Sequence, residues 1–299
     1  MPEILPQIIW FSLLASAIYA LIATGLTLLF GILNFINFAH GDFAMVGAYV
    51  FFALAIMLGL PWWIAVPLVI ACCALMGVVI EKITLKPVRK SPSFTPLIIS
   101  IGIGALLQAI ITIFFGSGVK SYRVEGAETA IYKLFGGSLI VTQSQIIIII
   151  TTILLLIGLH IFLKHSKTGK AVRAVADNME VASILGINID KTISIIFAIA
   201  TAMAGVGGLL IAYEQNLSVT MGISLGVKAF AAIILGGVGN ILGAVVGALV
   251  IGFGENLIVG FTPIPANFKD AIVFALLILM LFIRPNGLLG EKAESQVRK

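Results

Sequence analysis

Residues 144–163 read SQIIIIITTILLLIGLHIFL, with no Asp, Glu, Lys or Arg among them. A helix needs about 20 predominantly apolar residues to cross the hydrocarbon core of a bilayer, and this stretch has that length. Its apolar residues do not form the narrow stripe of a helix that packs on a soluble core. The stretch therefore predicts a membrane-spanning helix.

The rest of the chain has a similar composition. Its 299 residues are 60% hydrophobic and only 10% charged, whereas soluble domains carry roughly 25% charged residues. This composition excludes a water-soluble protein. The net charge of +5 does not indicate a nucleic-acid partner, because the basic residues lie in short segments beside apolar blocks. Cys72 and Cys73 are adjacent within one block, so we expect neither a disulfide framework nor a metal site.

Apolar blocks bounded by charges, Pro or Gly predict an all-α, polytopic helix bundle of about eight to nine membrane segments, forming a single transmembrane domain over residues 1–299. One block, 225–259, is too long for a single span. Gly236, Gly237, Gly239 and Asn240 at its middle predict a Gly-rich hairpin of two membrane segments, with a re-entrant segment as one form of it. The other expected spans are 8–30, 43–58, 62–85, 95–115, 144–163, 192–212 and 268–283.

Basic residues set the expected orientation. Most of them fall in three groups: Lys82, Lys86, Arg89 and Lys90; Lys164, Lys167, Lys170, Arg173 and Lys191; and Arg284, Lys292, Arg298 and Lys299. All three groups lie on one side of the membrane if the hairpin returns to its starting face. The positive-inside rule assigns that side to the cytoplasm and places the N-terminus outside.

Residues 34–43, NFINFAHGDF, place Asn34, Asn37, His40 and Asp42 between two apolar blocks. Polar groups within lipid are costly, so these side chains should face protein or water. One interpretation is a broken helix beside a translocation path. The other is an ordinary polar turn in which Asp42 is a helix N-cap.

Glycines crowd the hairpin, where Gly243 and Gly247 form a small-xxx-small face that lets helix backbones approach closely. Helix packing explains most of this pattern. A lining for the translocation path, formed by Gly236, Gly237 and Gly239, is the alternative.

Four charged residues stand at the edges of apolar blocks, where we expect them at the membrane interface. They are Glu214, Lys228, Glu255 and Asp270.

Residues 164–191 form a charged loop that has a helical pattern. Val172, Val175, Met179 and Ala182 recur at helical spacing, and Arg173 stands four residues before Asp177, as in an ion pair on a helix surface. Asp177 and Glu180 predict a capped helix start, and Gly186 predicts its end. A folded projection of this kind indicates a docking partner. A helix lying on lipid headgroups is the alternative.

The same loop contains Thr168, Gly169 and Lys170, but it lacks the remaining residues of a phosphate-binding loop. We therefore expect no nucleotide or other cofactor on this chain. Any step driven by ATP would take place on a partner.

Six ordered motifs then resemble one family, the membrane-spanning permease subunits of bacterial branched-chain amino-acid ABC importers. The resemblance covers nearly the whole chain, and Asp42 stands where a Glu is also found. The motifs are NFINFAHGD at 34–42, LKPVR at 85–89, GKAVRAVADN at 169–178, ASILGI at 182–187, LGGVGNILGA at 235–244 and RPNGLLG at 284–290.

The resemblance implies a permease, not an enzyme, in a multi-pass arrangement in the bacterial cytoplasmic (inner) membrane. It implies a second homologous permease subunit, two cytoplasmic ATP-binding subunits that hold ATP and Mg, and a periplasmic or extracellular substrate-binding protein. Loop 164–191 would then be the ATPase-coupling element. Its candidate residues are Gly169, Arg173, Ala176, Asp177, Asn178, Glu180, Ala182 and Gly186.

Two other function classes compete with this interpretation. A stand-alone channel or secondary transporter, for a small polar solute such as urea or another amide, would use charge pairs within the membrane, and central charges are sparse. An intramembrane enzyme would need a clustered nucleophile or metal site, whereas His40, His160 and His165 are scattered. The substrate class itself rests on the resemblance alone.

Overall fold

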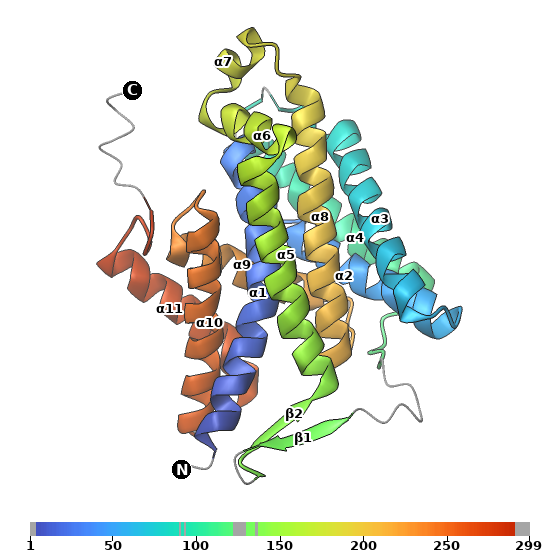
Figure 1. Ribbon diagram of the computed structural model, residues 1–299, viewed down its shortest axis with the longest axis vertical. Coiled ribbons are helices and arrows are strands. Elements are labelled where there is room, and N and C mark those ends of the chain that lie inside the picture. The colour runs from blue at the N-terminus through green and yellow to red at the C-terminus, as the bar shows by residue number, and fades with distance from the viewer. Residues whose placement is uncertain (1–3, 90, 93, 122–129, 135–136, 291–299) are drawn as a thin grey trace.

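The computed structural model describes residues 4–89, 91–92, 94–121, 130–134 and 137–290, and most of them are helical (Figure 1). The elements are α1 (Leu5–Leu33), α2 (His40–Phe52), η1 (Ala53–Met57), α3 (Trp62–Ile80), η2 (Glu81–Leu85), α4 (Phe94–Phe115), β1 (Ile131–Leu134), β2 (Leu139–Thr142), α5 (Gln143–His165), α6 (Lys167–Asp177), α7 (Met179–Ile184), α8 (Ile189–Glu214), α9 (Met221–Gly236), α10 (Ile241–Phe261), η4 (Ala266–Phe268) and α11 (Lys269–Ile283).

Two long helices, α1 and α8, form the centre of the bundle. Both are largely buried, and between them they pack against α2, α3, α5, α9 and α10. The outer helices α3, α4, α5 and α11 leave many of their apolar side chains exposed. Helices with a buried side and an exposed apolar side are what a bundle in lipid requires, because the surrounding solvent is itself apolar. Eight helices in the described part of the chain are long and apolar enough to cross a membrane, as the fold class predicts.

The Gly-rich block divides as predicted into a hairpin. Helix α9 ends at Gly236 and α10 begins at Ile241, and Gly237 and Gly239 have positive φ angles, which glycine adopts without steric cost. The two arms approach closely because a Cβ at Gly247 would clash with the backbone carbonyl of Ala232. With 16 residues, α9 is shorter than the eight long spans, and its first turn begins four residues before the predicted block.

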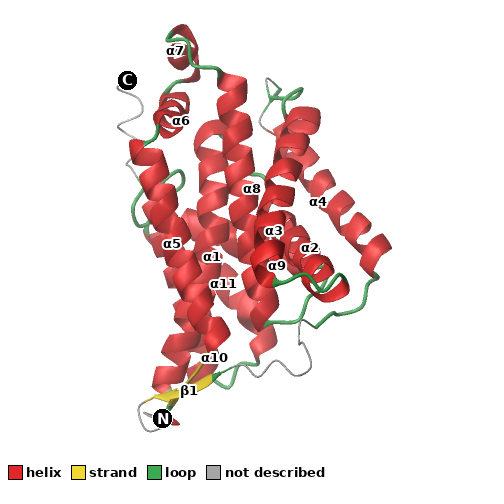
Figure 2. Ribbon diagram, turned by 45° about the vertical axis from the view of Figure 1, so that its right-hand side comes forward, coloured by secondary structure: helices red, strands yellow, loops and turns green. Residues whose placement is uncertain are grey.

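Contacts place the three basic segments on one side of the bundle. Lys86 Nζ lies 2.8 Å from an oxygen of Asp190 at the start of α8, directly after α6 and α7. Near the other end of the chain, the amide of Leu288 donates to the carbonyl of Leu235 at 2.8 Å, and the turn after α9 lies close to Lys164. Helix α1 begins at the opposite end of the bundle (Figures 1 and 2). The positive-inside rule predicts that the α6–α7 side faces the cytoplasm, and this end of the bundle is called the cytoplasmic end on that basis. Lys90, Lys292, Arg298 and Lys299 lie outside the described residues.

Several predicted boundaries differ from the observed ones. The first helix runs three residues further at each end than 8–30, and α2 begins at His40 instead of 43. His40 and Asp42 are polar, so hydropathy alone places the start of α2 too far inward. A small antiparallel pair, β1 with β2, precedes α5 on the outer side and was not predicted.

Candidate functional site

A cytoplasmic projection is formed by the two short helices α6 and α7 (Figure 1). Ser166 caps α6 by accepting the amide of Gly169 at 2.8 Å, and Asn178 caps α7 by accepting the amides of Glu180 and Val181, both at 3.0 Å. A side-chain cap satisfies an amide that a helix start leaves without a partner. Each helix therefore has a defined start, and the projection is folded as predicted.

Apolar residues and one glycine attach the projection to the bundle. Val172, Val175 and Ala182 are buried in the main core, and Gly169 packs against the backbone of α5 so tightly that a Cβ would clash. The guanidinium of Arg173 donates to the carbonyl of Leu163 near the end of α5. These contacts hold the projection against the end of α5 and the core of the bundle.

Two details of the predicted projection are wrong. Asp177 is the last residue of α6 and caps no helix, because Asn178 has the extended backbone that a cap requires. In the described structure, Arg173 forms an ion pair neither with Asp177 nor with Glu180, since its guanidinium turns back to α5. The predicted end of the helix at Gly186 is confirmed by its φ of 82°.

The remaining predicted coupling residues lie at the surface of the projection. Ala176, Asp177, Asn178, Glu180 and Gly186 are all exposed. Beside them, Ile184 and Leu185 are 84% and 73% exposed, at the tip of α7. Apolar side chains this exposed in a cytoplasmic segment are typical of a surface that another protein covers. Sequence analysis missed this pair, although the ASILGI motif contains it.

The polar segment 34–43 is a break between two helices. Asn34 ends α1 with a left-handed φ of 54°, and α2 starts at His40 after a short loop. The Asn37 carboxamide oxygen accepts the amide of Ala39 at 3.1 Å. Asp42 is not the N-cap, since Ala39 holds that position. Its carboxylate instead accepts a 2.8 Å hydrogen bond from Gln108 of α4.

Within this break, two buried side chains have atoms that no described group satisfies. His40 is fully buried, and its Nε2 lies 3.1 Å from the carbonyl of Ile22, but its Nδ1 has no partner. Asn37 Nδ2 is likewise without one. An unsatisfied buried polar atom costs about 1–3 kcal/mol. This polar break therefore has unused hydrogen-bonding capacity deep in the bundle.

The predicted path residues do not form one cluster. His40 lies beside Ile22 of α1, whereas Gly239 lies in a pocket with Gly31. Nine residues of helix separate these two levels, which corresponds to about 14 Å along α1. Asn34 is exposed, and the end of α9 is joined to the segment after α11, because the amides of Leu288 and Leu289 donate to the carbonyls of Leu235 and Gly236. The glycine turn thus lies at the cytoplasmic end, and the polar break lies deeper.

A buried charge cluster was missed. Lys228 Nζ of α9 lies 3.0 Å from both Glu255 Oε2 and the Tyr19 hydroxyl, and 3.3 Å from Asp270. The Tyr19 hydroxyl donates to Glu255 Oε1 at 2.7 Å. The interface position expected for Lys228 and Glu255 is wrong, because the two face each other across packed helices. Asp270 is half exposed at the start of α11, closer to the expectation.

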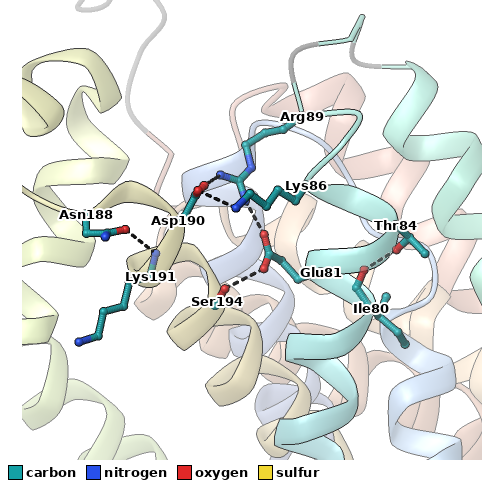
Figure 3. Close-up of polar contacts among 9 residues, drawn as sticks. All are labelled: Ile80, Glu81, Thr84, Lys86, Arg89, Asn188, Asp190, Lys191 and Ser194. Carbon is teal, nitrogen blue, oxygen red and sulfur yellow. Dashed lines mark hydrogen bonds and ion pairs between the residues drawn. The ribbon is translucent and has the colours of Figure 1, made fainter.

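A second ionic cluster joins α3 and α8 at the cytoplasmic end (Figure 3). Arg89 pairs with Glu81, and its other nitrogen lies 2.8 Å from Asp190. The second oxygen of Glu81 accepts a 2.8 Å hydrogen bond from Ser194. Glu81 is buried, so its charge depends on these partners. Arg89 belongs to the LKPVR motif, which the sequence could not connect to α8.

The fold and these elements define a class. A polytopic helix bundle with a buried polar break and a folded projection at one end fits a component of a membrane transport system. The chain belongs to the family described as "Branched-chain amino acid transport system / permease component", which matches residues 8–281.

Individual relatives agree with the family. The chain is 37% identical to the high-affinity branched-chain amino acid transport system permease protein LivH of Escherichia coli (strain K12), covering 93% of each chain. It is 33% identical to BraD of Pseudomonas aeruginosa, a protein of the same description, covering 99% of this chain and 100% of the relative. The solved structure of PsaBC from Streptococcus pneumoniae in complex with Fab is similar in fold, with a TM-score of 0.52 at 12% identity, covering 93% and 92%.

Proposed function

We propose that this chain is the permease subunit of an ATP-driven importer in the bacterial cytoplasmic membrane, and that it carries branched-chain amino acids. It would work with a second permease subunit, two cytoplasmic ATPase subunits that bind ATP and Mg, and a substrate-binding protein on the outer side. The names of LivH and BraD support the substrate class. The α6–α7 projection is the single observation that carries the coupling role.

In this proposal the ATPase binds the tip of α7. Ile184 and Leu185 would enter an apolar groove of the ATPase, and Glu180 would lie at the polar rim of the contact. The packing of Gly169 and Val172 against the spans would pass the ATPase movement to α5 and α8.

Co-purification of the ATPase with the permease tests the docking role. Burial of one such side chain stabilises a complex by about 1.5–3 kcal/mol, so loss of both in Ile184→Ser with Leu185→Ser should weaken association by at least about 100-fold. Val238→Ser is the matched control, because Val238 is 46% exposed on the neighbouring α9–α10 turn, outside the projection. ATPase yields equal to wild type for the double variant would refute docking at this tip, provided that both variants insert normally.

The polar break would lie beside the translocation path. Its support is the unpartnered Nδ1 of His40 and Nδ2 of Asn37, which a passing polar solute or water could satisfy. Gly236, Gly237 and Gly239 would line the cytoplasmic exit, and Asn34 and Asp42 would flank the break. Since Asn37 and His40 are buried here, exposure to the path requires another conformation of the transporter.

Cysteine accessibility in the assembled transporter tests this role. In a background with Cys72→Ser and Cys73→Ala, cysteine at Asn37 or His40 should react with a polar thiol reagent in one nucleotide state and not in the other. A cysteine at Ile113, which is 79% exposed on α4, reports non-specific labelling. Inertness of both test positions in every nucleotide state would remove them from the path.

The alternative is a stand-alone channel or secondary transporter, and the Lys228–Glu255 pair is the observation that favours it. The chain should show no solute flux in liposomes without an ATPase, with or without an ion gradient. Leucine, isoleucine and valine uptake should appear only with the ATPase, ATP and the binding protein. Flux by the chain alone would favour the alternative, and urea competing with leucine would change the substrate class.

A further inference from the structure

A pocket of about 440 Å³ opens at the cytoplasmic end of the bundle, between α1, α5, α6 and the turn before α10. Leu28 and Ile32 of α1 line it together with Leu163 of α5 and Ile241 of α10. Helix α6 lies across this end of α5 and α1 (Figure 1). The pocket is separate from the exposed tip of α7 and from the polar break at His40.

The charged groups that line this pocket are basic. Lys164 and Arg173 line it with His160, and no carboxylate of the described residues does so. In the described structure, neither Lys164 nor Arg173 forms an ion pair. The nearby pocket between α3 and α8 is different, because there Asp190 pairs with Lys86. The pocket beneath α6 therefore has positive charge that the protein itself does not balance.

An apolar surface leads from the pocket towards the middle of the membrane. On α5, Ile150, Ile153, Ile157 and Ile161 are each about half exposed, and they follow one another towards Lys164. A lipid-facing helix exposes such a stripe, and its basic end marks the headgroup level of the cytoplasmic leaflet. The basic pocket thus continues directly into an acyl-chain surface.

We propose that this pocket binds the headgroup of an anionic phospholipid of the cytoplasmic leaflet, whose acyl chains lie along α5. Basic pockets between membrane helices on the cytoplasmic side suit anionic headgroups. A phosphate free in solution would make no use of the apolar floor or of the α5 stripe. The lipid would contact α6 at Arg173 and α1 at Gly31, so it would stabilise the packing of α6 against the bundle.

Native mass spectrometry of the full purified chain tests the site, since lipid binding can be measured without the ATPase. Phosphatidylglycerol is compared with phosphatidylcholine of identical acyl chains. Wild type should retain phosphatidylglycerol more tightly. Each basic residue near an anionic lipid contributes about 1 kcal/mol, or about fivefold, so Lys164→Gln with Arg173→Gln should weaken phosphatidylglycerol binding by about 25-fold. Lys82→Gln with Lys191→Gln removes equal charge around the α3–α8 pocket and should leave the preference unchanged.

A second variant distinguishes loss of lipid binding from misfolding of the projection. Gly31 lines the pocket, and a Cβ added there meets no atom within 4 Å, so Gly31→Phe fills the space without removing charge. It should also abolish the preference while the thermal unfolding temperature stays at the wild-type value. The proposal is overturned if wild type shows no preference, if the Lys82/Lys191 control loses it equally, if Gly31→Phe keeps it, or if millimolar inorganic phosphate displaces the lipid.

Discussion

Removal of Lys228 should strongly destabilise the bundle. Glu255 is 1% exposed and has Lys228 as its cationic partner at 3.0 Å. Lys228→Met leaves the Glu255 carboxylate buried with only the Tyr19 hydroxyl as a described partner. Loss of one partner of a buried ion pair typically costs 3–5 kcal/mol, because a desolvated charge remains. We expect the free energy of unfolding to fall by about 4 kcal/mol, as measured by detergent titration of the purified chain.

A double-mutant cycle shows whether this cost comes from the stranded charge. Glu255→Gln alone should cost less, because Lys228 keeps Asp270 at 3.3 Å. The double variant should cost less than the sum of the two by about 2–3 kcal/mol. The exposed pair Lys86–Asp190, about half exposed at both partners, is the control and should couple by less than about 1 kcal/mol. The reasoning would be refuted if the cost of the double variant equalled the sum of the costs of Lys228→Met and Glu255→Gln within about 0.5 kcal/mol.

Three further perturbations test the packing, the cytoplasmic ion cluster and the projection. Gly41→Leu should prevent stable folding because a side chain there meets the backbone of α9, whereas Gly102→Leu, in open space, should express normally in the membrane. Arg89→Ala should lower the free energy of unfolding by about 3 kcal/mol by stranding the buried Glu81 carboxylate, and an unchanged detergent midpoint would contradict this. Asn178→Ala removes the cap of α7 and should destabilise that helix by about 1 kcal/mol, seen as faster amide exchange confined to α7.

Short-range patterns predicted much of this protein. The length of the apolar block at 144–163 is enough for a span, since a helix satisfies its backbone hydrogen bonds within itself. Glycines in the block 225–259 placed the turn between α9 and α10, because only glycine adopts the positive φ angles of Gly237 and Gly239 without steric cost. The end of α7 at Gly186 follows from the same local chemistry.

The projection shows where local reasoning reaches its limit. Valines at helical spacing predicted a folded segment, but the choice between Asp177 and Asn178 as a cap depends on which residue has an extended backbone. Arg173 had a suitably spaced partner in Asp177, yet it binds a carbonyl of α5. Competition between a local and a distant partner is decided only when the helices pack.

Only the tertiary structure decided which helices, distant in the sequence, bring their side chains together. Tyr19 comes from α1, whereas Lys228 and Glu255 come from the two arms of the α9–α10 hairpin, and nothing within any one of those helices indicates that their polar groups meet. Glu81 and Asp190 are likewise joined only through Arg89. Hydropathy and helix periodicity are local properties of a chain, and they determined that these helices cross the membrane. Which side of each helix meets which neighbour depends on the packing of the whole bundle, and that packing placed the buried charges, the polar break and the basic pocket.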